Sequence, residues 1–493
     1  MSLEPLEPPS SLSLPAASAD EQLLKKLGYK QELARRMSGF SNFAISLSII
    51  CILAGGITSF QVGFCSVGGA SIGLGWPLVC LFSLVVAATM AQVASAFPTA
   101  GGLYHWASIL GGKGWGWITA WFNLVGLLTV VAAVNSGTYD FIVGAFHLPE
   151  VASSRLVKGA GVATIIISHA LFNHKGIRLT SRLIDLSGYL IFAITLLLTL
   201  ALLIYAPSHD FSRLLHFSNY SGIPPKEPVF PRTENIVWLF ALGFLLPAYT
   251  ITGFDASAHT SEETIDAAHN VPRGIVRSVL VSGIFGWVML IAIVLAIPDM
   301  NAAAGQGANV FYWIMDQALP RPVRTFLFAG IALSQYFCGM AALTSTSRMA
   351  YAFARDGGLP FSQFVREVHA VSRSPVAAIW ASALLGLAFV LFVPYTTIAA
   401  ICVIFLYISY VLPSVAGFFA HGRTWTVMGP WHLGRWYRPL AILAATGCIF
   451  LIVIGMQPPN QQALWIVAGV IILLSVAWFG FESRRFKGPP QIH

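Results

Sequence analysis

The sequence has very little charge for its length. Only 10% of its 493 residues are Asp, Glu, Lys or Arg, while 56% are apolar. An ordinary soluble domain has roughly a quarter of its residues charged. A soluble globule of this composition would have too few polar residues to cover its surface, so the composition excludes that class and predicts an integral membrane protein.

The sequence also lacks the patterns of several functional classes. It contains neither an HExxH motif nor a GxSxG elbow with catalytic partners, so no enzyme is predicted. No repeated filter loop suggests a channel, and no ATP-binding motif is present, so no cofactor is expected and transport would use an ion or solute gradient. The six cysteines have no CxxC spacing, and we expect small buried residues rather than a metal or disulfide site: Cys51, Cys65, Cys80, Cys338, Cys402 and Cys448.

Long apolar stretches recur along nearly the whole chain. A helix that crosses the hydrocarbon core needs about 20 mostly apolar residues, because each residue adds about 1.5 Å. The sequence predicts an all-α protein with twelve transmembrane helices, near 43–65, 76–96, 115–143, 157–174, 183–206, 235–256, 277–297, 325–354, 376–393, 396–420, 439–455 and 462–481.

The ends of the chain are polar. We predict an N-terminal tail over 1–36, with disorder over 1–20, a transmembrane domain over 37–482 and a C-terminal tail over 483–493. Most of the 28 Lys and Arg residues lie on the side of the N-terminus, which predicts cytoplasmic termini, most simply in the plasma membrane. The net charge of +8 then reflects topology and anionic lipid, and no nucleic-acid partner is expected.

Two spans contain residues that interrupt helices. The first carries the small-residue run 54–59, with paired glycines, which fits either close helix packing or a helix break. The sixth combines Pro247, Gly253 and Asp255 within ten residues, and an internal proline removes a helical hydrogen bond. Interrupted first and sixth helices are what a five-plus-five inverted repeat predicts around a midplane binding site.

Three motifs carry a family resemblance. The segments 36–40, 253–263 and 347–360 resemble those of the amino acid/polyamine/organocation permeases, and most closely the amino acid and choline transporter branch. The resemblance covers roughly residues 25–480. It implies a LeuT-like fold with ten core helices in two inverted repeats, two peripheral helices, and secondary active transport by alternating access.

The resemblance also implies a binding site between the two interrupted helices. Carbonyls that end the first half-helices attract an ammonium, and amides that begin the second halves, near Ile57 and Phe254, attract a carboxylate. An α-amino acid carries both charges. By position, the substrate-binding residues are Ala54, Gly55, Gly56, Ile57, Tyr249, Thr250, Ile251, Thr252 and Gly253. Tyr249 lies where the family often has an aromatic gate, and its ring would attract an amine.

The coupling ion is left open by the sequence. Asp255 fits either a helix cap for the second half of the sixth helix or a role in coupling or amine binding. Thr344, Ser345 and Thr346 offer sodium ligands, and no other metal site is predicted. Other polar residues within the spans fit either the cavity lining or a hydrogen bond between helices: Asn123, Asn135, Gln335 and Tyr336.

Several substrates and one different function remain open. The expected cargo is an amino acid or a close amine derivative such as γ-aminobutyrate (GABA), and the main rival is choline or a polyamine. A non-transporting nutrient sensor on a permease scaffold is the alternative from another class, although its usual long cytoplasmic extension is missing here.

Overall fold

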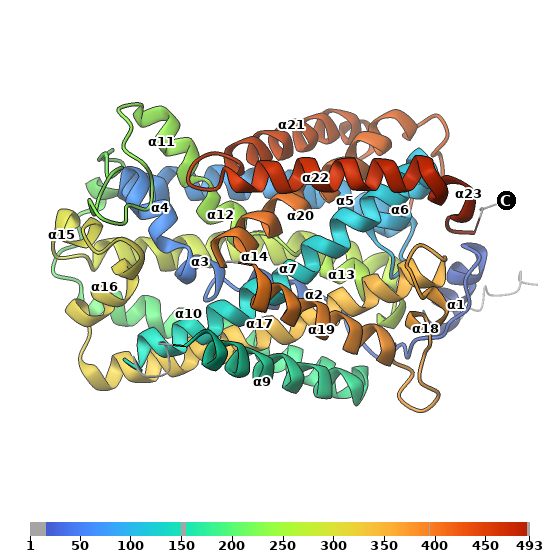
Figure 1. Cartoon of the computed structure of the whole chain (residues 1–493), viewed down its shortest axis with the longest axis horizontal. Helices are drawn as coiled ribbons and strands as arrows, with labels where there is room; N and C mark the ends of the chain where they lie inside the picture. The colour runs from blue at the N-terminus through green and yellow to red at the C-terminus, as the bar shows by residue number, and fades with distance from the viewer. Residues whose placement is uncertain (1–15, 149–153, 394, 491–493) are drawn as a thin grey trace, which may run out of the picture.

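The structure, a computed structural model, describes residues 16–148, 154–393 and 395–490 (Figure 1). Over these ranges the chain is helical and has no strand, only two isolated bridges. The predicted all-α class is therefore confirmed. The main helices are α5 (Trp76–Ala96), α7 (Lys113–Ala145), α9 (Arg155–His174), α10 (Ile177–Tyr205), α14 (Ala267–Leu295), α17 (Arg321–Arg355), α19 (Val376–Phe392), α20 (Tyr395–Ala420), α21 (Tyr437–Gly455) and α22 (Gln462–Ala477).

Ten helical segments in the described ranges are long and apolar enough to cross a membrane. They are Gly39–Thr58, Ser71–Ala96, Lys113–Ala145, Arg155–His174, Ile177–Tyr205, Ala267–Leu295, Arg321–Arg355, Thr397–Ala420, Gly434–Gly455 and Gln462–Arg485. Two further apolar helices, Ile236–Thr250 and Val376–Phe392, are shorter. These segments make the chain an integral, multi-pass membrane protein.

The first apolar segment and the segment that begins at Ile236 are both interrupted. The first consists of α2 (Gly39–Ile50), α3 (Gly55–Thr58) and α4 (Phe60–Val67). The other consists of α11 (Ile236–Gly243), α12 (Leu245–Thr250) and α13 (Ala256–His259). The non-helical residues between α12 and α13 lie where the sequence predicts a break, whereas those between α2 and α3, residues 51–54, lie mostly just before the predicted run 54–59.

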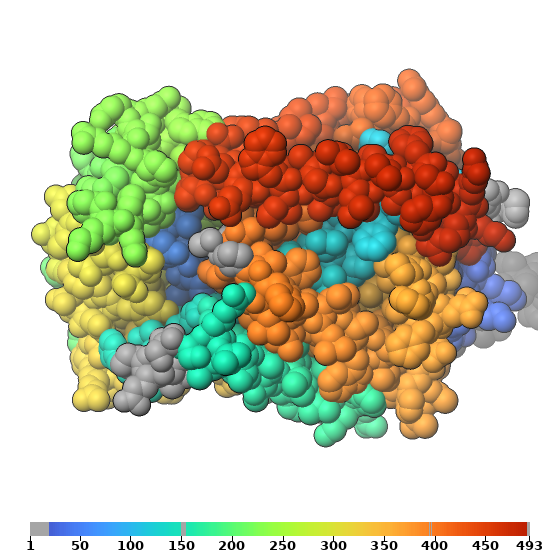
Figure 2. All heavy atoms as spheres, in the orientation of Figure 1, coloured from blue at the N-terminus to red at the C-terminus, as the bar shows by residue number. Residues whose placement is uncertain are grey.

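The long helices pack around α7. This helix contacts α20, α17 and the short helix α6 (Leu103–Gly111), while α14 packs against α5 and α2. By contrast, α22 runs along the surface of the bundle (Figure 2), and only 11% of its most apolar window is buried. The last two long helices lie at the periphery, since the apolar window of α21 is also only 33% buried.

Several short helices lie at the two ends of the bundle (Figure 1). One end carries α4, α11, α15 (Met300–Ala304) and α16 (Val310–Ala318). The other carries α1 (Ala16–Lys26), α18 (Ser362–Val365) and α23 (Ser483–Arg485). The two tails lie together at this second end, since Gly28 packs against Pro490. We call it the inner end, after the predicted cytoplasmic termini.

The prediction of a disordered tail over 1–20 is wrong for its last five residues, and residues 1–15 lie outside the described ranges. Residues 16–20 belong to α1. The Asp20 carboxylate accepts hydrogen bonds from the amides of Asp266 at 2.7 Å and Ala267 at 3.0 Å, at the start of α14. These two charge-assisted bonds fix α1 on the inner end.

Helix packing depends on glycine at Gly286. A β-carbon added there would lie 2.5 Å from a ring carbon of Trp76, which is fully buried. We expect Gly286→Leu to lower the midpoint of thermal unfolding in detergent, because overpacking a core costs about 1–3 kcal/mol. Gly469→Leu is the matched control, since a β-carbon there meets nothing within 4 Å. Equal midpoints for the two variants would contradict this packing.

Candidate functional site

A small cavity of about 30 Å³ lies where the two interrupted helices meet α7, α17 and α20. Its volume leaves room for about one water molecule and not for an amino acid. It is lined by Ile49, Ile50, Ala54, Gly55, Thr58, Val130, Ala133, Val134, Gly137, Tyr249, Thr252, Gln335, Cys338 and Cys402. In this conformation the cavity is therefore too small to hold an amino acid.

The first interruption begins at Cys51, which ends α2 with φ 20° and ψ 85°. The helix resumes at Gly55, two residues before the predicted start at Ile57. A β-carbon on Gly55 would lie 2.8 Å from the backbone Cα of Thr250, so the lack of a side chain lets the two breaks touch. The neighbouring Gly56 is different, because a β-carbon there would meet only the Met289 methyl at 3.5 Å.

The second interruption is centred on Gly253, whose φ of 82° is left-handed. A β-carbon on this residue would lie 2.3 Å from a methyl of Ile49, so glycine is required both by the backbone conformation and by the space. The helix resumes at Ala256 rather than at Phe254.

Two of the amides around this second break already have hydrogen-bond partners. The Gly253 amide donates to the Tyr410 hydroxyl at 3.0 Å, and the Ser257 amide donates to Ser46 Oγ at 3.0 Å. These two amides flank the predicted position at Phe254. A substrate carboxylate that binds either of them would have to displace a hydroxyl.

The structure brings together four of the nine predicted substrate-binding residues at the cavity wall: Ala54, Gly55, Tyr249 and Thr252. The other five shape the two breaks without lining the cavity: Gly56, Ile57, Thr250, Ile251 and Gly253. Thr252 Oγ1 donates to the Tyr249 carbonyl at 2.8 Å, which closes the last turn of the half-helix beside the cavity.

Gln335 of α17 both lines the cavity and forms a hydrogen bond between helices, the two roles that the sequence leaves open. Its Nε2 donates to the carbonyl of Leu53 in the first break at 3.0 Å, and its side chain lines the cavity. Its Oε1 is buried and has no hydrogen-bond partner in the described protein. This free oxygen is an acceptor available to a bound ammonium.

Other lining residues give no signal in the sequence. Val130, Ala133, Val134 and Gly137 come from α7, and they are small or apolar residues of an ordinary membrane helix. Cys338 and Cys402 are likewise buried and apolar in character. None of the residues that line the cavity carries a charged side chain, so the wall itself is electrically neutral.

The Asp255 side chain does not cap the helix, which corrects that part of the prediction. It precedes α13 but makes no capping hydrogen bond. Its carboxylate is fully buried and instead contacts Tyr410 Oη at 2.9 Å, Asn123 Nδ2 at 3.1 Å and His259 Nε2 at 3.2 Å. Three neighbouring side chains on three helices therefore solvate this acid, because it lies beyond the reach of water.

The proposed sodium ligands do not converge on one point. Thr344 Oγ1 donates to Asn173 Oδ1 at 2.8 Å, whereas Thr346 Oγ1 donates to the Ala342 carbonyl at 2.7 Å. Ser345 Oγ is buried without a hydrogen-bond partner. Consecutive residues of a helix point about 100° apart, so these three hydroxyls face different neighbours. The described ranges also contain no group of three His, Cys, Asp or Glu side chains placed to hold a metal.

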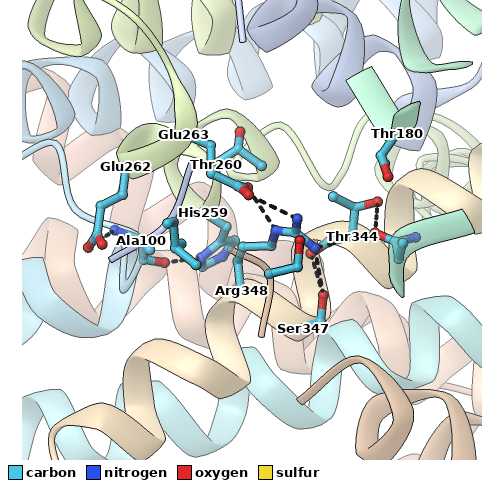
Figure 3. Close-up of polar contacts among 12 residues, drawn as sticks. Ala100, Thr180, His259, Thr260, Glu262, Glu263, Thr344, Ser347 and Arg348 are labelled. Carbon is cyan, nitrogen blue, oxygen red and sulfur yellow. Dashed lines mark hydrogen bonds and ion pairs between the residues drawn. The ribbon is translucent and has the colours of Figure 1, made fainter. Parts of the chain in front are cut away.

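The inner end is closed by two ion pairs, of which Figure 3 shows the pair of Arg348 with Glu263. Arg348 pairs with Glu263 through contacts of 2.8 and 3.0 Å, and both side chains are fully buried. Arg355 pairs with Glu262 through contacts of 2.9 and 3.0 Å. Both pairs join the continuous helix α17 to the loop after α13. They therefore hold the inner half of the second interrupted helix against α17.

The N-terminal segment covers these pairs. The hydroxyls of Tyr29 and Tyr104 both donate to Asp356 Oδ2 at 2.8 Å, and the Tyr29 ring lies 3.8 Å from the Arg355 guanidinium. Burial raises the pKa of Asp356, although the Arg355 charge opposes this shift. Burial also raises the pKa of Tyr29 well above its ordinary value. The tail thereby completes the inner closure.

Comparisons with known proteins agree with this architecture. The family model for amino acid permeases matches residues 37–478. The chain is 33% identical to the amino-acid permease BAT1 of Arabidopsis thaliana, over 97% of each chain. It is 34% identical to the BAT1 homolog of Oryza sativa subsp. japonica, over 94% of each chain. It is also 30% identical to the GABA-specific permease of Saccharomyces cerevisiae, over 95% of this chain and 86% of the relative.

These matches run through both interrupted helices and through the residues that pair at the inner end. They describe transporters and not enzymes, as the missing catalytic motifs also indicate. Because the family model covers nearly all of the helical bundle and the relatives align from end to end, this chain belongs to the amino acid permease family.

Proposed function

We propose that this permease is a secondary active transporter that moves small neutral amino acids, including ω-amino acids such as GABA, by alternating access. The observation that supports this best is the meeting of two interrupted helices at a small central cavity, with buried ion pairs sealing the inner end. A central site that is closed on the inner side must open there before a substrate leaves.

The proposed fold is LeuT-like, with twelve spans, two inverted repeats of five helices, and α21 and α22 as the peripheral pair. Positions of the breaks in the first and sixth spans support the repeat. The low burial of α22 supports its peripheral place. In this arrangement the transmembrane domain covers 37–482, and the tails 1–36 and 483–493 are cytoplasmic in the plasma membrane.

The neutrality of the cavity wall supports a neutral substrate side chain. A buried charge without a partner is costly, and the lining residues offer no charged group to compensate a third substrate charge. The amino and carboxylate groups of the substrate can be stabilised by partial charges on neutral protein groups. Gln335 Oε1 would accept from the ammonium, and the amides of Gly56 and Ile57 in α3 would receive the carboxylate, since the Gly55 amide already donates to the Cys51 carbonyl.

The GABA-specific relative is consistent with the same two contacts, because a GABA molecule carries both charges at the two ends of a short apolar chain. Which of these amino acids this permease carries is tested by tracer uptake into proteoliposomes across a panel of amino acids and amines.

The topology is tested by surface labelling of single cysteines. Lys226 lies in an exposed loop at the end opposite the tails, and Val371 is 88% exposed at the inner end. We expect an impermeant maleimide to label Lys226→Cys in whole cells and not Val371→Cys. Background labelling should be low, because five of the six native cysteines are buried and Cys80 is partly buried. The reverse pattern would place the tails outside the cell.

The contact between the two breaks is tested by two adjacent alanines. Gly55→Ala places a methyl against the Thr250 backbone, while Gly56→Ala has room beside Met289. We expect the first variant to lower initial uptake at least about tenfold, because the backbone must move apart by a few tenths of an ångström. The second variant should retain most of its uptake. Equal rates would mean that the close approach at Gly55 does not matter for transport.

The substrate class is tested by competition. Only an amino acid has a carboxylate for the amides of α3, so it should compete for uptake at least about tenfold better than its decarboxylated amine. Losing one charge-assisted hydrogen-bonded group costs roughly 1.5 to 3 kcal/mol. Equal competition by the amine or by choline would instead favour an organic-cation carrier.

A further inference from the structure

Asp255 and His259 form an isolated acid–imidazole pair one helical turn apart, just inside the second break. Both side chains have no exposed surface. His259 Nε2 lies 3.2 Å from Asp255 Oδ2, and His259 Nδ1 lies 3.0 Å from the carbonyl oxygen of Ala100 (Figure 3). Every hydrogen-bonding atom of the imidazole therefore has a neighbour.

The carbonyl of Ala100 determines how many protons this pair holds. A carbonyl oxygen only accepts, so Nδ1 of His259 carries a proton. The remaining contact, between Nε2 and the carboxylate oxygen, is a hydrogen bond only if it contains a proton as well. The pair is then either an imidazolium with a carboxylate or a neutral imidazole with a carboxylic acid. Each form holds one proton more than a neutral imidazole beside a carboxylate.

We propose that Asp255 and His259 together form the proton-binding site that couples amino acid transport to a proton gradient. This rests on the proposed function, since a coupling site has meaning only in a transporter. Loading adds one proton from water to the Nε2–Oδ2 contact. Release returns that proton to water and leaves two lone-pair-bearing atoms facing each other, which repel, so the contact opens.

The pair is connected to the substrate cavity through one hydroxyl. Tyr410 Oη donates to Asp255 Oδ1 at 2.9 Å and accepts the Gly253 amide at 3.0 Å. Gly253 is the left-handed residue of the second break, and the adjacent Thr252 lines the cavity. A change in the charge or position of the Asp255 carboxylate therefore reaches Gly253 through the hydroxyl of Tyr410.

The surroundings leave the pair as the group that titrates. Asp255 is also faced by Asn123 Nδ2 at 3.1 Å, which contacts Ser409 of α20 as well. The nearby acid Glu262 accepts the Ala100 amide but is paired with Arg355. Likewise Glu263 is paired with Arg348. In the described ranges no Lys or Arg forms an ion pair with Asp255, so His259 is its one cationic partner.

The wild-type protein gives the first test. In sodium-free proteoliposomes with a pH-sensitive dye inside, adding an amino acid that shows counterflow should acidify the lumen. Lowering the external pH by one unit should raise initial uptake at least about threefold. Absence of counterflow for every amino acid would overturn the proposed function. Counterflow without acidification, or uptake indifferent to the pH step, would overturn the proton site while leaving that function standing.

Asp255→Asn gives the second test, because an amide imitates the protonated acid. The new Nδ2 donates to His259 Nε2, and Asn123 can turn its Oδ1, which is buried without a hydrogen-bond partner, toward the new amide. We expect counterflow to persist while stimulation by the pH step is lost. His105→Gln is the matched control, since His105 is also a buried histidine but contacts Thr99 rather than a carboxylate. It should keep the stimulation.

Persistence of the pH stimulation in Asp255→Asn would overturn the assignment to this pair. If Asp255→Asn does not elute as a folded protein in detergent, His259→Gln takes its place with the same readout, because a glutamine amide still reaches the carboxylate. Retained stimulation in that variant would overturn the assignment equally. Loss of stimulation in His105→Gln as well would show a general packing effect and would also count against the pair.

Discussion

A helix that is interrupted inside a membrane exposes backbone groups that lipid cannot satisfy, and this constraint organises the molecule. At the first break the Leu53 carbonyl accepts a hydrogen bond from Gln335 Nε2, and the Ile49 carbonyl accepts one from the thiol of Cys338. In the second, the Gly253 amide is held by Tyr410. Continuous helices α17 and α20 thus supply the hydrogen bonds that the broken helices lack, and the cavity lies among these contacts.

The inner closure is a different kind of interaction, suited to opening. Removing one partner of a buried ion pair typically costs about 3–5 kcal/mol, because the other charge is left without water. Separating the Glu263–Arg348 pair into a water-filled vestibule costs less free energy, since both charges regain hydration when they part. Buried ion pairs can therefore seal the inner end firmly without making the open state inaccessible.

The sequence predicted the helical class and, to within a few residues, the positions of both breaks, because each has a strong local signal: apolar length, and Gly and Pro inside a span. It could not predict the lining residues Val130 and Cys402, which are chemically ordinary and become site residues only through packing. It also could not decide between the two roles of Asp255, because local sequence shows the helix start but not Tyr410 or Asn123, which contact the carboxylate from other helices.

The two breaks differ in the side chains that hydrogen-bond their backbone groups, and we propose different roles for them on this basis. The first is held by neutral groups, Gln335 and the thiol of Cys338, whose hydrogen bonds do not change with proton concentration in the physiological range. The second is held by Tyr410, which is bonded in turn to the acid–imidazole pair. A protein with two titratable breaks would disturb its substrate contacts whenever it exchanged a proton. With one neutral and one titratable break, a substrate can be recognised at the first while the proton acts at the second, and the close contact of Gly55 with Thr250 joins the two.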